Sequence, residues 1–136
     1  MICLDTNAVI AVISGRHPTV RRRLMSEISA GSPIALPVVA LFEIRYGAAK
    51  SVRPDKSVEA LNEFLAFGIS ILPFEIEDAE EAGQIRADLE RVGRPIGPYD
   101  ILIAAQARRR GATLVTANHG ELARVAGLRV EDWSAG

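Results

Sequence analysis

The chain has 136 residues, a formal net charge of −1 at pH 7, 49% hydrophobic residues and 24% charged residues. This composition is typical of one soluble globular domain, and no apolar run approaches the roughly 18 residues that span a bilayer. Cys3 is the single cysteine, which excludes an internal disulfide and a thiolate metal cage. We therefore expect a single domain over residues 1–136 in the cytoplasm, without a signal peptide or a membrane partner.

Strand-like apolar runs alternate with helix-like segments along the chain. Thr6 or Asn7 is expected to cap the first helix. The clearest helix spans residues 75–92, with a predicted apolar stripe from Ile76 to Val92. Its acids precede its arginines, as the helix dipole favours, so we interpret those acids as structural. We expect strands at 2–5, 34–36, 69–72, 114–116 and 128–130, and helices at 8–13, 18–29, 38–50, 55–68, 75–92, 98–107 and 121–125.

Strands that are separated by helices of this length pair in parallel through right-handed crossovers. Such sheets gather their ligands at the carboxyl ends of the strands. The order of segments therefore predicts an α/β fold with its functional site at one edge of a parallel sheet.

Three acids lie where the hydrophobic pattern predicts the core. Asp5 ends a strand, Glu43 interrupts an apolar helix, and Asp100 opens another apolar helix. Buried carboxylates are rare unless they are paired. Glu121 follows a later strand and completes a candidate set of four.

Four carboxylates at one edge repel each other unless cations intervene, and oxygen ligands favour Mg²⁺ or Mn²⁺ over zinc. Such ions activate water against a phosphodiester, so the set predicts metal-assisted hydrolysis. Structural alternatives stay open for each acid. Asp5 could belong to a helix cap, Glu43 could pair with an arginine, and Asp100 and Glu121 could be first-turn acids.

Arginine makes up 14 of the 16 basic residues, which suits a phosphate ligand better than the net charge suggests. The run Arg21, Arg22 and Arg23 follows a loop and is a candidate RNA contact. The run at residues 108–110 closes a helix, and we expect it to be a solvated helix end. His119 is interpreted as a solvated turn residue, with general-base catalysis as the alternative.

Three segments together resemble PIN-domain nucleases, and VapC toxins in particular. Residues 2–7 (ICLDTN) resemble the opening strand and first acid of that family, and residues 43–48 (EIRYGA) resemble its second-acid helix. Residues 93–105 (GRPIGPYDILIAA) resemble the third-acid segment very closely. The motifs LVTAN at 114–118 and LRVEDW at 128–133 fit the same family, so the likeness runs nearly end to end.

The resemblance implies a three-layer α/β/α PIN-like fold with a central parallel sheet of 4–5 strands, often dimeric. It implies a Mg²⁺-dependent endoribonuclease, with Mn²⁺ as a substitute, that is the toxin of a type II toxin–antitoxin pair with a VapB-type antitoxin. The motif set is closest to the branch that cleaves initiator tRNA. By position, the catalytic and metal-binding acids are Asp5, Glu43, Asp100 and Glu121. Thr6, Asn7, Thr116 and Asn118 are expected to support these ligands.

Two other functions remain open at this point. A Mg²⁺-dependent phosphatase of another α/β fold would use Asp5 as its nucleophile, but Asn7 replaces the second Asp that such enzymes need. A PIN-like binding module would keep the fold and lose the chemistry, with Asn118 as the mark of a weakened metal site. Apolar residues on the helices at 38–50 and 55–68 predict a surface for an antitoxin segment or a second subunit.

Overall fold

Five short apolar runs pair as parallel strands of one sheet in the computed structural model, which describes residues 1–134. The sheet order is β3-β2-β1-β4-β5. The strands are β1 (Ile2–Leu4), β2 (Ile34–Pro37), β3 (Ser70–Leu72), β4 (Thr113–Val115) and β5 (Arg129–Glu131). The helices are α1 (Thr6–Ser14), α2 (Pro18–Ser29), α3 (Val38–Ala49), α4 (Pro54–Leu65), α5 (Ile76–Arg91), α6 (Pro98–Arg109) and α7 (His119–Leu122).

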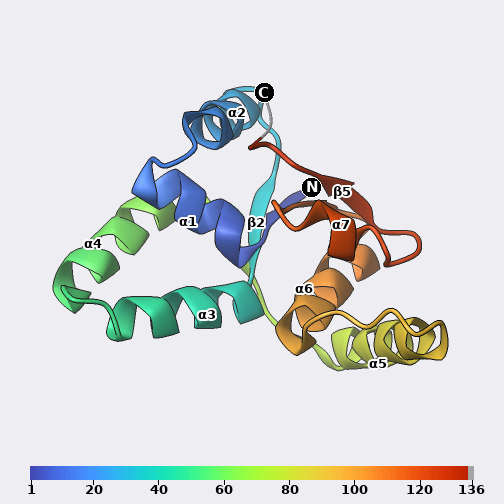
Figure 1. Ribbon diagram of the computed structural model, residues 1–136. Helices are drawn as coiled ribbons and strands as arrows, with labels where there is room; N and C mark the ends of the chain where they lie inside the picture. The colour runs from blue at the N-terminus through green and yellow to red at the C-terminus, as the bar shows by residue number, and fades with distance from the viewer. Residues whose placement is uncertain (135–136) are drawn as a thin grey trace.

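The chain winds outward from β1 in two directions, first to β2 and β3 and later to β4 and β5. Figure 1 shows α1, α3 and α4 on one side of the strands, with α2 against α1, and α5 and α6 on the other side. The predicted three-layer α/β/α fold with a five-stranded parallel sheet is therefore confirmed. Because the strand order reverses between β1 and β4, their carboxyl ends open the crevice where parallel sheets bind ligands.

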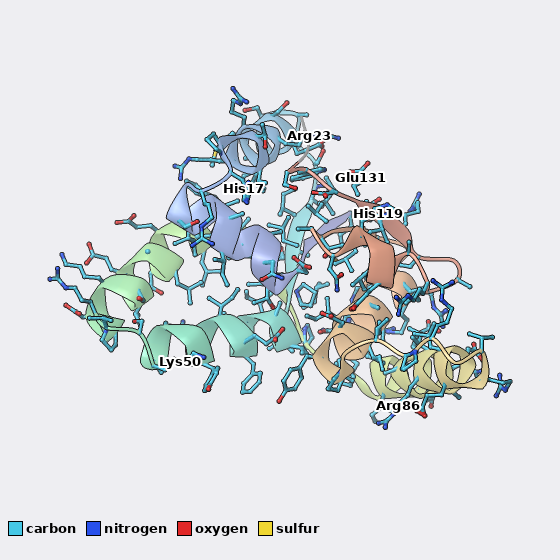
Figure 2. The ribbon with its side chains drawn as sticks, in the orientation of Figure 1. His17, Arg23, Lys50, Arg86, His119 and Glu131 are labelled. Atoms are coloured by element: carbon cyan, nitrogen blue, oxygen red, sulfur yellow. The ribbon has the colours of Figure 1, made fainter. Side chains whose placement is uncertain are left out.

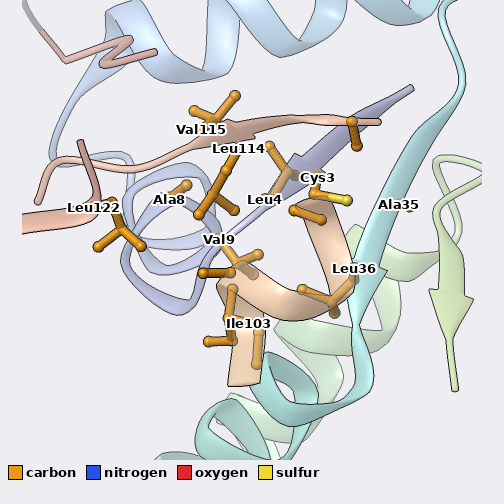
Figure 3. Close-up of a cluster of buried hydrophobic side chains, with 14 of the residues drawn as sticks. Cys3, Leu4, Ala8, Val9, Ala35, Leu36, Ile103, Leu114, Val115 and Leu122 are labelled. Carbon is orange, nitrogen blue, oxygen red and sulfur yellow. The ribbon is translucent and has the colours of Figure 1, made fainter. Parts of the chain in front are cut away.

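The core joins the central strands to both helical layers (Figure 3). Leu4, Leu36 and Leu114 come from three adjacent strands and are all fully buried. Val9 of α1 and Ile103 of α6 pack around them, each 1% exposed or less. Burial of this kind stabilises a fold by about 25 cal/mol per Å² of apolar surface. It also fixes the ends of β1 and β4 rigidly, which a functional site at that edge requires.

The lone cysteine behaves as a small hydrophobe. Cys3 is fully buried in β1, and burial raises the pKa of its thiol to about 11. A thiol in that state is neutral and unreactive at pH 7.

Most segment boundaries agree with the pattern to within one or two residues, but three predictions are wrong. The helix expected over residues 55–68 ends at Leu65. Ile76 is 79% exposed and Val92 is 67% exposed, so the buried stripe of α5 is shorter than expected. The last short helix begins at His119 and ends at Leu122, rather than spanning residues 121–125. The amide of Ala123 bonds to the carbonyl of His119, which draws the loop residues into the helical turn. The single-domain assignment over residues 1–136 stays a prediction, and its last two residues lie outside the described part of the chain.

The arginine run at the end of α6 is not a solvated helix end, which corrects another prediction. Arg108 pairs with Glu81 at 2.7 Å, and Arg109 and Arg110 reach Asp78 Oδ1 at 2.7 and 2.8 Å. Asp78 lies in the first turn of α5 and is fully buried. These pairs hold α5 to α6, because a buried carboxylate is stabilised only by partners of opposite charge.

Candidate metal centre

Asp5 stands directly after β1 and caps α1. Its Oδ1 accepts a hydrogen bond from the amide of Ala8 at 2.8 Å, and the residue is only 5% exposed. The structure thus assigns the cap to Asp5, which is the structural alternative that the sequence offered for this acid, and not to Thr6 or Asn7. Thr6 lies in the first turn of α1, and Asn7 beside it is exposed. A cap accounts for one carboxylate oxygen of Asp5 and leaves its burial unexplained.

Glu43 lies in the middle of α3 and is half-buried. The hydroxyl of Thr6 donates to its Oε1 at 2.7 Å, which ties α3 to the start of α1. No arginine or lysine pairs with Glu43 within residues 1–134, so the ion-pair alternative for this acid is not what the structure contains.

Asp100 lies in the first turn of α6 and bends back toward the glycine that precedes the helix. A Cβ atom on Gly97 would lie 3.6 Å from Asp100 Oδ2, which is ordinary van der Waals contact. The sequence signal for this arrangement was the Gly97-Pro98 pair, because proline suits the first position of a helix.

Asn118 and Glu121 lie at the two ends of one turn after β4. The side-chain nitrogen of Asn118 donates to Glu121 Oε2 at 2.8 Å, and a hydrogen bond from the Asn118 side chain opposes the increase in the pKa of Asp100. The Asn118 side chain therefore donates hydrogen bonds to both Glu121 and Asp100. Thr116 is 1% exposed. Its hydroxyl accepts a hydrogen bond from the backbone N–H of Asn118 at 2.9 Å, and its side chain also hydrogen-bonds to Asp5.

Burial and neighbouring acids raise the pKa of two of these carboxylates, Asp5 and Asp100. Burial raises the pKa of Asp5 to about 6, with further increases from Asp100 and Glu43 that the hydrogen bonds to Thr116 and Ala8 oppose. Burial is also the largest cause of the raised pKa of Asp100, and the charges of Glu43 and Glu121 raise it further. No cation is among the causes of either shift, so the four acids form one electrostatic group of like charge.

This donor set fits a hard divalent cation. It consists of carboxylates from four separate segments, with hydroxyl and amide groups that orient them, and such oxygens are what Mg²⁺ and Mn²⁺ prefer. In the described chain, no three acidic, histidine or cysteine side chains yet converge closely enough to form one finished ligand set. Glu43 and Glu121 are only half-buried, so both carboxylates are open to solvent and to a cation that enters from it.

The candidate RNA contacts on α2 are partly occupied by the protein itself. Arg23 lies over the Trp133 ring at 5.1 Å and pairs with Glu27 at 3.4 Å. Figure 2 shows Arg23 close to Glu131, to which it lies 3.9 Å away. Arg21 lies 5.9 Å from the centre of the Phe67 ring. His119 is exposed on α7 (Figure 2), as expected of a turn residue.

No helix within residues 1–134 combines the length and the apolar character that crossing a membrane requires.

The sequence and the fold both match known proteins. The PIN domain family profile matches residues 2–128. The chain is 42% identical to the tRNA(fMet)-specific endonuclease VapC of Shigella flexneri and 37% identical to that of Salmonella typhimurium, over 96% of each chain. It superposes on a chain of VapBC2 from Rickettsia felis, bound to a DNA fragment from their promoter, with a TM-score of 0.90 and 31% identity over 98% of this chain and 99% of that one. For DNA-bound VapBC from Salmonella typhimurium the TM-score is 0.88, with 36% identity over 97% of both chains.

VapC nucleases with this domain are metal-dependent. The chain therefore belongs to the PIN domain family and, within it, to the VapC ribonucleases of toxin–antitoxin systems, as the resemblance of its motifs predicted.

Proposed function

We propose that this chain is an endoribonuclease toxin that hydrolyses tRNA phosphodiesters with Mg²⁺, for which Mn²⁺ can substitute. Asp5, Glu43, Asp100 and Glu121 are the proposed metal ligands. One observation carries the proposal. Asp5 and Asp100 are buried beside further acids at the carboxyl edge of the sheet, with no cation among the groups that shift them. Burial raises the pKa of both, and the increase is enlarged by Asp100 and Glu43 for Asp5 and by Glu43 and Glu121 for Asp100. Such an arrangement is unfavourable to folding and is explained by a cation that binds there.

A divalent cation bound there would activate the attacking water and neutralise charge on the scissile phosphate. The chain's own groups set the ligands in place. The Ala8 amide fixes one oxygen of Asp5, and the Thr6 hydroxyl fixes one oxygen of Glu43. The Asn118 amide holds Glu121 and interacts with Asp100. These bonds orient the carboxylates before substrate arrives, as groups that surround metal ligands commonly do.

Support for tRNA as the substrate comes from the relatives. Those of Shigella flexneri and Salmonella typhimurium are named as tRNA(fMet)-specific, and both span nearly the whole of this chain. We propose tRNA on that ground and propose the cytoplasm as the place of action. No base-reading contact is assigned.

We further propose that an antitoxin of the VapB type occupies the groove between α1, α3 and α4. The matched structures are VapBC complexes. The groove measures about 410 Å³, and Glu43 lies in its wall among apolar residues. It is lined by Ile10, Ile13, Ser14, Glu43, Ile44, Gly47, Ala48, Lys56, Ser57 and Ala60. A segment bound there would lie directly against one proposed metal ligand, which suits an inhibitor.

A different face of α3 is our proposed homodimer surface. Phe42 and Tyr46 are more than half exposed, and Tyr99 lies edge-on to Phe42 with ring centres 5.6 Å apart. Exposed aromatic residues of this kind are enriched at protein interfaces.

A cleavage assay on tRNA tests the proposed function. We expect cleavage with Mg²⁺ or Mn²⁺, and none in EDTA or in the Asp5→Asn variant. Asp55→Asn is the matched control, because Asp55 is an exposed acid in the first turn of α4. Phosphate release from small monoesters without RNA cleavage would indicate the phosphatase. A folded, metal-supplied chain without turnover on tRNA would indicate the binding module.

A further inference from the structure

Arg124 links the segment that carries Glu121 to the loop that leads into Asp100. It directly follows the last turn of α7, and its Nη1 donates to the carbonyl of Pro95 at 3.1 Å. Pro95 lies in the loop between α5 and α6, five residues before Asp100. The bond therefore joins two segments that each bring one acid to the edge of the sheet.

A second arginine makes a reciprocal bond from the other side. Arg108 of α6 donates from Nη1 to the carbonyl of Ala126, two residues beyond Arg124, at 3.0 Å. The turn after α7 is thus held to α6 by one arginine and to the loop before α6 by another. Both arginines border the same hollow, together with the α5 residues Ile85 and Leu89.

The short helix needs such support. With four residues, α7 is too short to be stable on its own. The side chain of its N-cap residue, Asn118, makes no capping bond, and its nitrogen donates to Glu121. Leu122 and Val125 anchor the segment in the core with 1% and 2% of their surface exposed. Those apolar contacts fix its depth, while directional bonds are needed to fix its position relative to α6.

The surroundings of Arg124 are not those expected of a residue whose only role is to stabilise the fold. Its Nε atom is buried and has no hydrogen-bond partner anywhere in residues 1–134. A buried donor without an acceptor is a loss for the folded state. With Nε turned inward and Nη1 on Pro95, the guanidinium does not present the open fork that grips a phosphate.

We infer that Arg124 is a positioning residue of the proposed metal site, which sets the place of Glu121 relative to Asp100 through its bond to Pro95. This inference rests on the proposed function, because it assumes that Glu121 is a metal ligand. Arg124 touches neither the acids nor the substrate in this scheme and acts only through the position of α7.

The test is a Mn²⁺ titration of the RNA-free protein, with binding measured by calorimetry. We expect Arg124→Gln to bind Mn²⁺ about 10-fold more weakly than the parent chain, the low end of the effect of groups that orient metal ligands. Arg124→Lys, which keeps a donor for Pro95, should recover part of the loss. In a chain that already carries Glu121→Gln, adding Arg124→Gln should change the affinity by less than about twofold, because coupled residues are not additive.

Arg129→Gln is the matched control. Arg129 also donates to a loop carbonyl, that of Gly111, but it lies on β5, and Gly111 precedes β4, at the other end of that strand from Glu121. It should leave Mn²⁺ affinity unchanged. RNA affinity is measured in parallel in the inactive Asp5→Asn chain, where Arg124→Gln should leave the salt dependence of binding unchanged.

Each other result overturns the inference in a recognisable way. If the parent chain binds no Mn²⁺, both the proposed function and the inference are wrong. If the parent binds Mn²⁺ and Arg124→Gln binds it equally well, only the inference fails. A lower melting temperature with unchanged Mn²⁺ affinity in both Arg124 variants indicates a purely structural role. A weaker salt dependence of RNA binding indicates a phosphate contact instead.

Discussion

Two buried aspartates in this fold have opposite surroundings. Asp78, in the first turn of α5, receives hydrogen bonds from Arg109 and Arg110 at 2.7 and 2.8 Å. Asp5, after β1, has Asp100 and Glu43 as its charged neighbours. Burial raises the pKa of Asp78, but the hydrogen bonds from Arg110, the Glu75 backbone and Arg109 outweigh it and lower the pKa overall. Burial raises the pKa of Asp5 to about 6, and its acidic neighbours add to the increase.

The difference teaches how to separate a structural acid from a functional one. Around Asp78 the chain supplies its own cations, so the group is complete without a ligand and serves to join α5 to α6. Around Asp5 the chain supplies further acids and no cation, which is why we propose that a metal ion binds there. Burial alone does not distinguish the two residues, since Asp78 is 0% exposed and Asp5 is 5% exposed.

The largest effect is expected when the proposed metal site loses a ligand. Asp100→Asn should lower the rate of tRNA cleavage by about 1,000-fold or more, equivalent to roughly 4 kcal/mol of transition-state stabilisation. Without metal, the variant should be at least as stable as the parent, because one of several repelling charges is gone. Cleavage kinetics and thermal melts in EDTA measure the two effects. A large loss of stability would show that Asp100 is structural.

The opposite pattern is expected at the arginine-paired acid. Asp78→Asn should destabilise the fold by about 3 kcal/mol, because it leaves two arginines without their buried partner. Cleavage per folded molecule should stay within about twofold, since Asp78 is not among the proposed ligands. Urea unfolding and single-turnover cleavage at low temperature check this. A variant that melts like the parent would contradict the structural role of this pair.

The two aspartates should also give opposite dependences of stability on pH. A raised folded-state pKa means that Asp5 stabilises the protein below pH 3.8, its ordinary pKa, and that this stability is lost as the pH rises through about 6. The metal-free chain should lose up to about 3 kcal/mol through this group between pH 4 and 7. Asp78, with its lowered pKa, contributes stability above pH 3.8 that is lost as the pH falls through its folded-state value.

Unfolding by urea at several pH values in EDTA separates these two contributions. Asp5→Asn should remove the loss between pH 4 and 7, and Asp78→Asn should leave that loss in place. If both variants keep the parent's profile over this range, the raised pKa of Asp5 does not affect folding.

The smallest effect is expected on α2, outside both acid groups. Arg23 is engaged with Glu27 and Trp133, so Arg22 and Arg21 are the better candidates for RNA contact. Changing both to Ala in the inactive Asp5→Asn chain should weaken tRNA binding several-fold and reduce its salt slope by about 1–2. Fluorescence anisotropy at several salt concentrations measures this. An unchanged slope would show that α2 is not part of the RNA footprint.

The sequence determined the parts of this protein that depend on neighbours along the chain. The spacing of apolar residues and the positions of the prolines predicted most helices and strands, because secondary structure depends on short-range preferences of the backbone. Asp5, Glu43 and Asp100 were recognisable as candidates because each interrupts an apolar run, and the motifs around them identified the family.

The tertiary structure decided which distant groups became partners. Thr6 meets Glu43 across 37 positions of the sequence, and Arg109 meets Asp78 across 31. The run at residues 108–110 offered no sign that it would pair with α5, because an arginine at a helix end suits solvent and an ion pair equally well. Long-range pairing depends on how the helices pack against the sheet, and no local pattern encodes it. For this reason the sequence could name the acids, while only the fold could show that arginines neutralise Asp78 and that Asp5 and Asp100 lie among other acids.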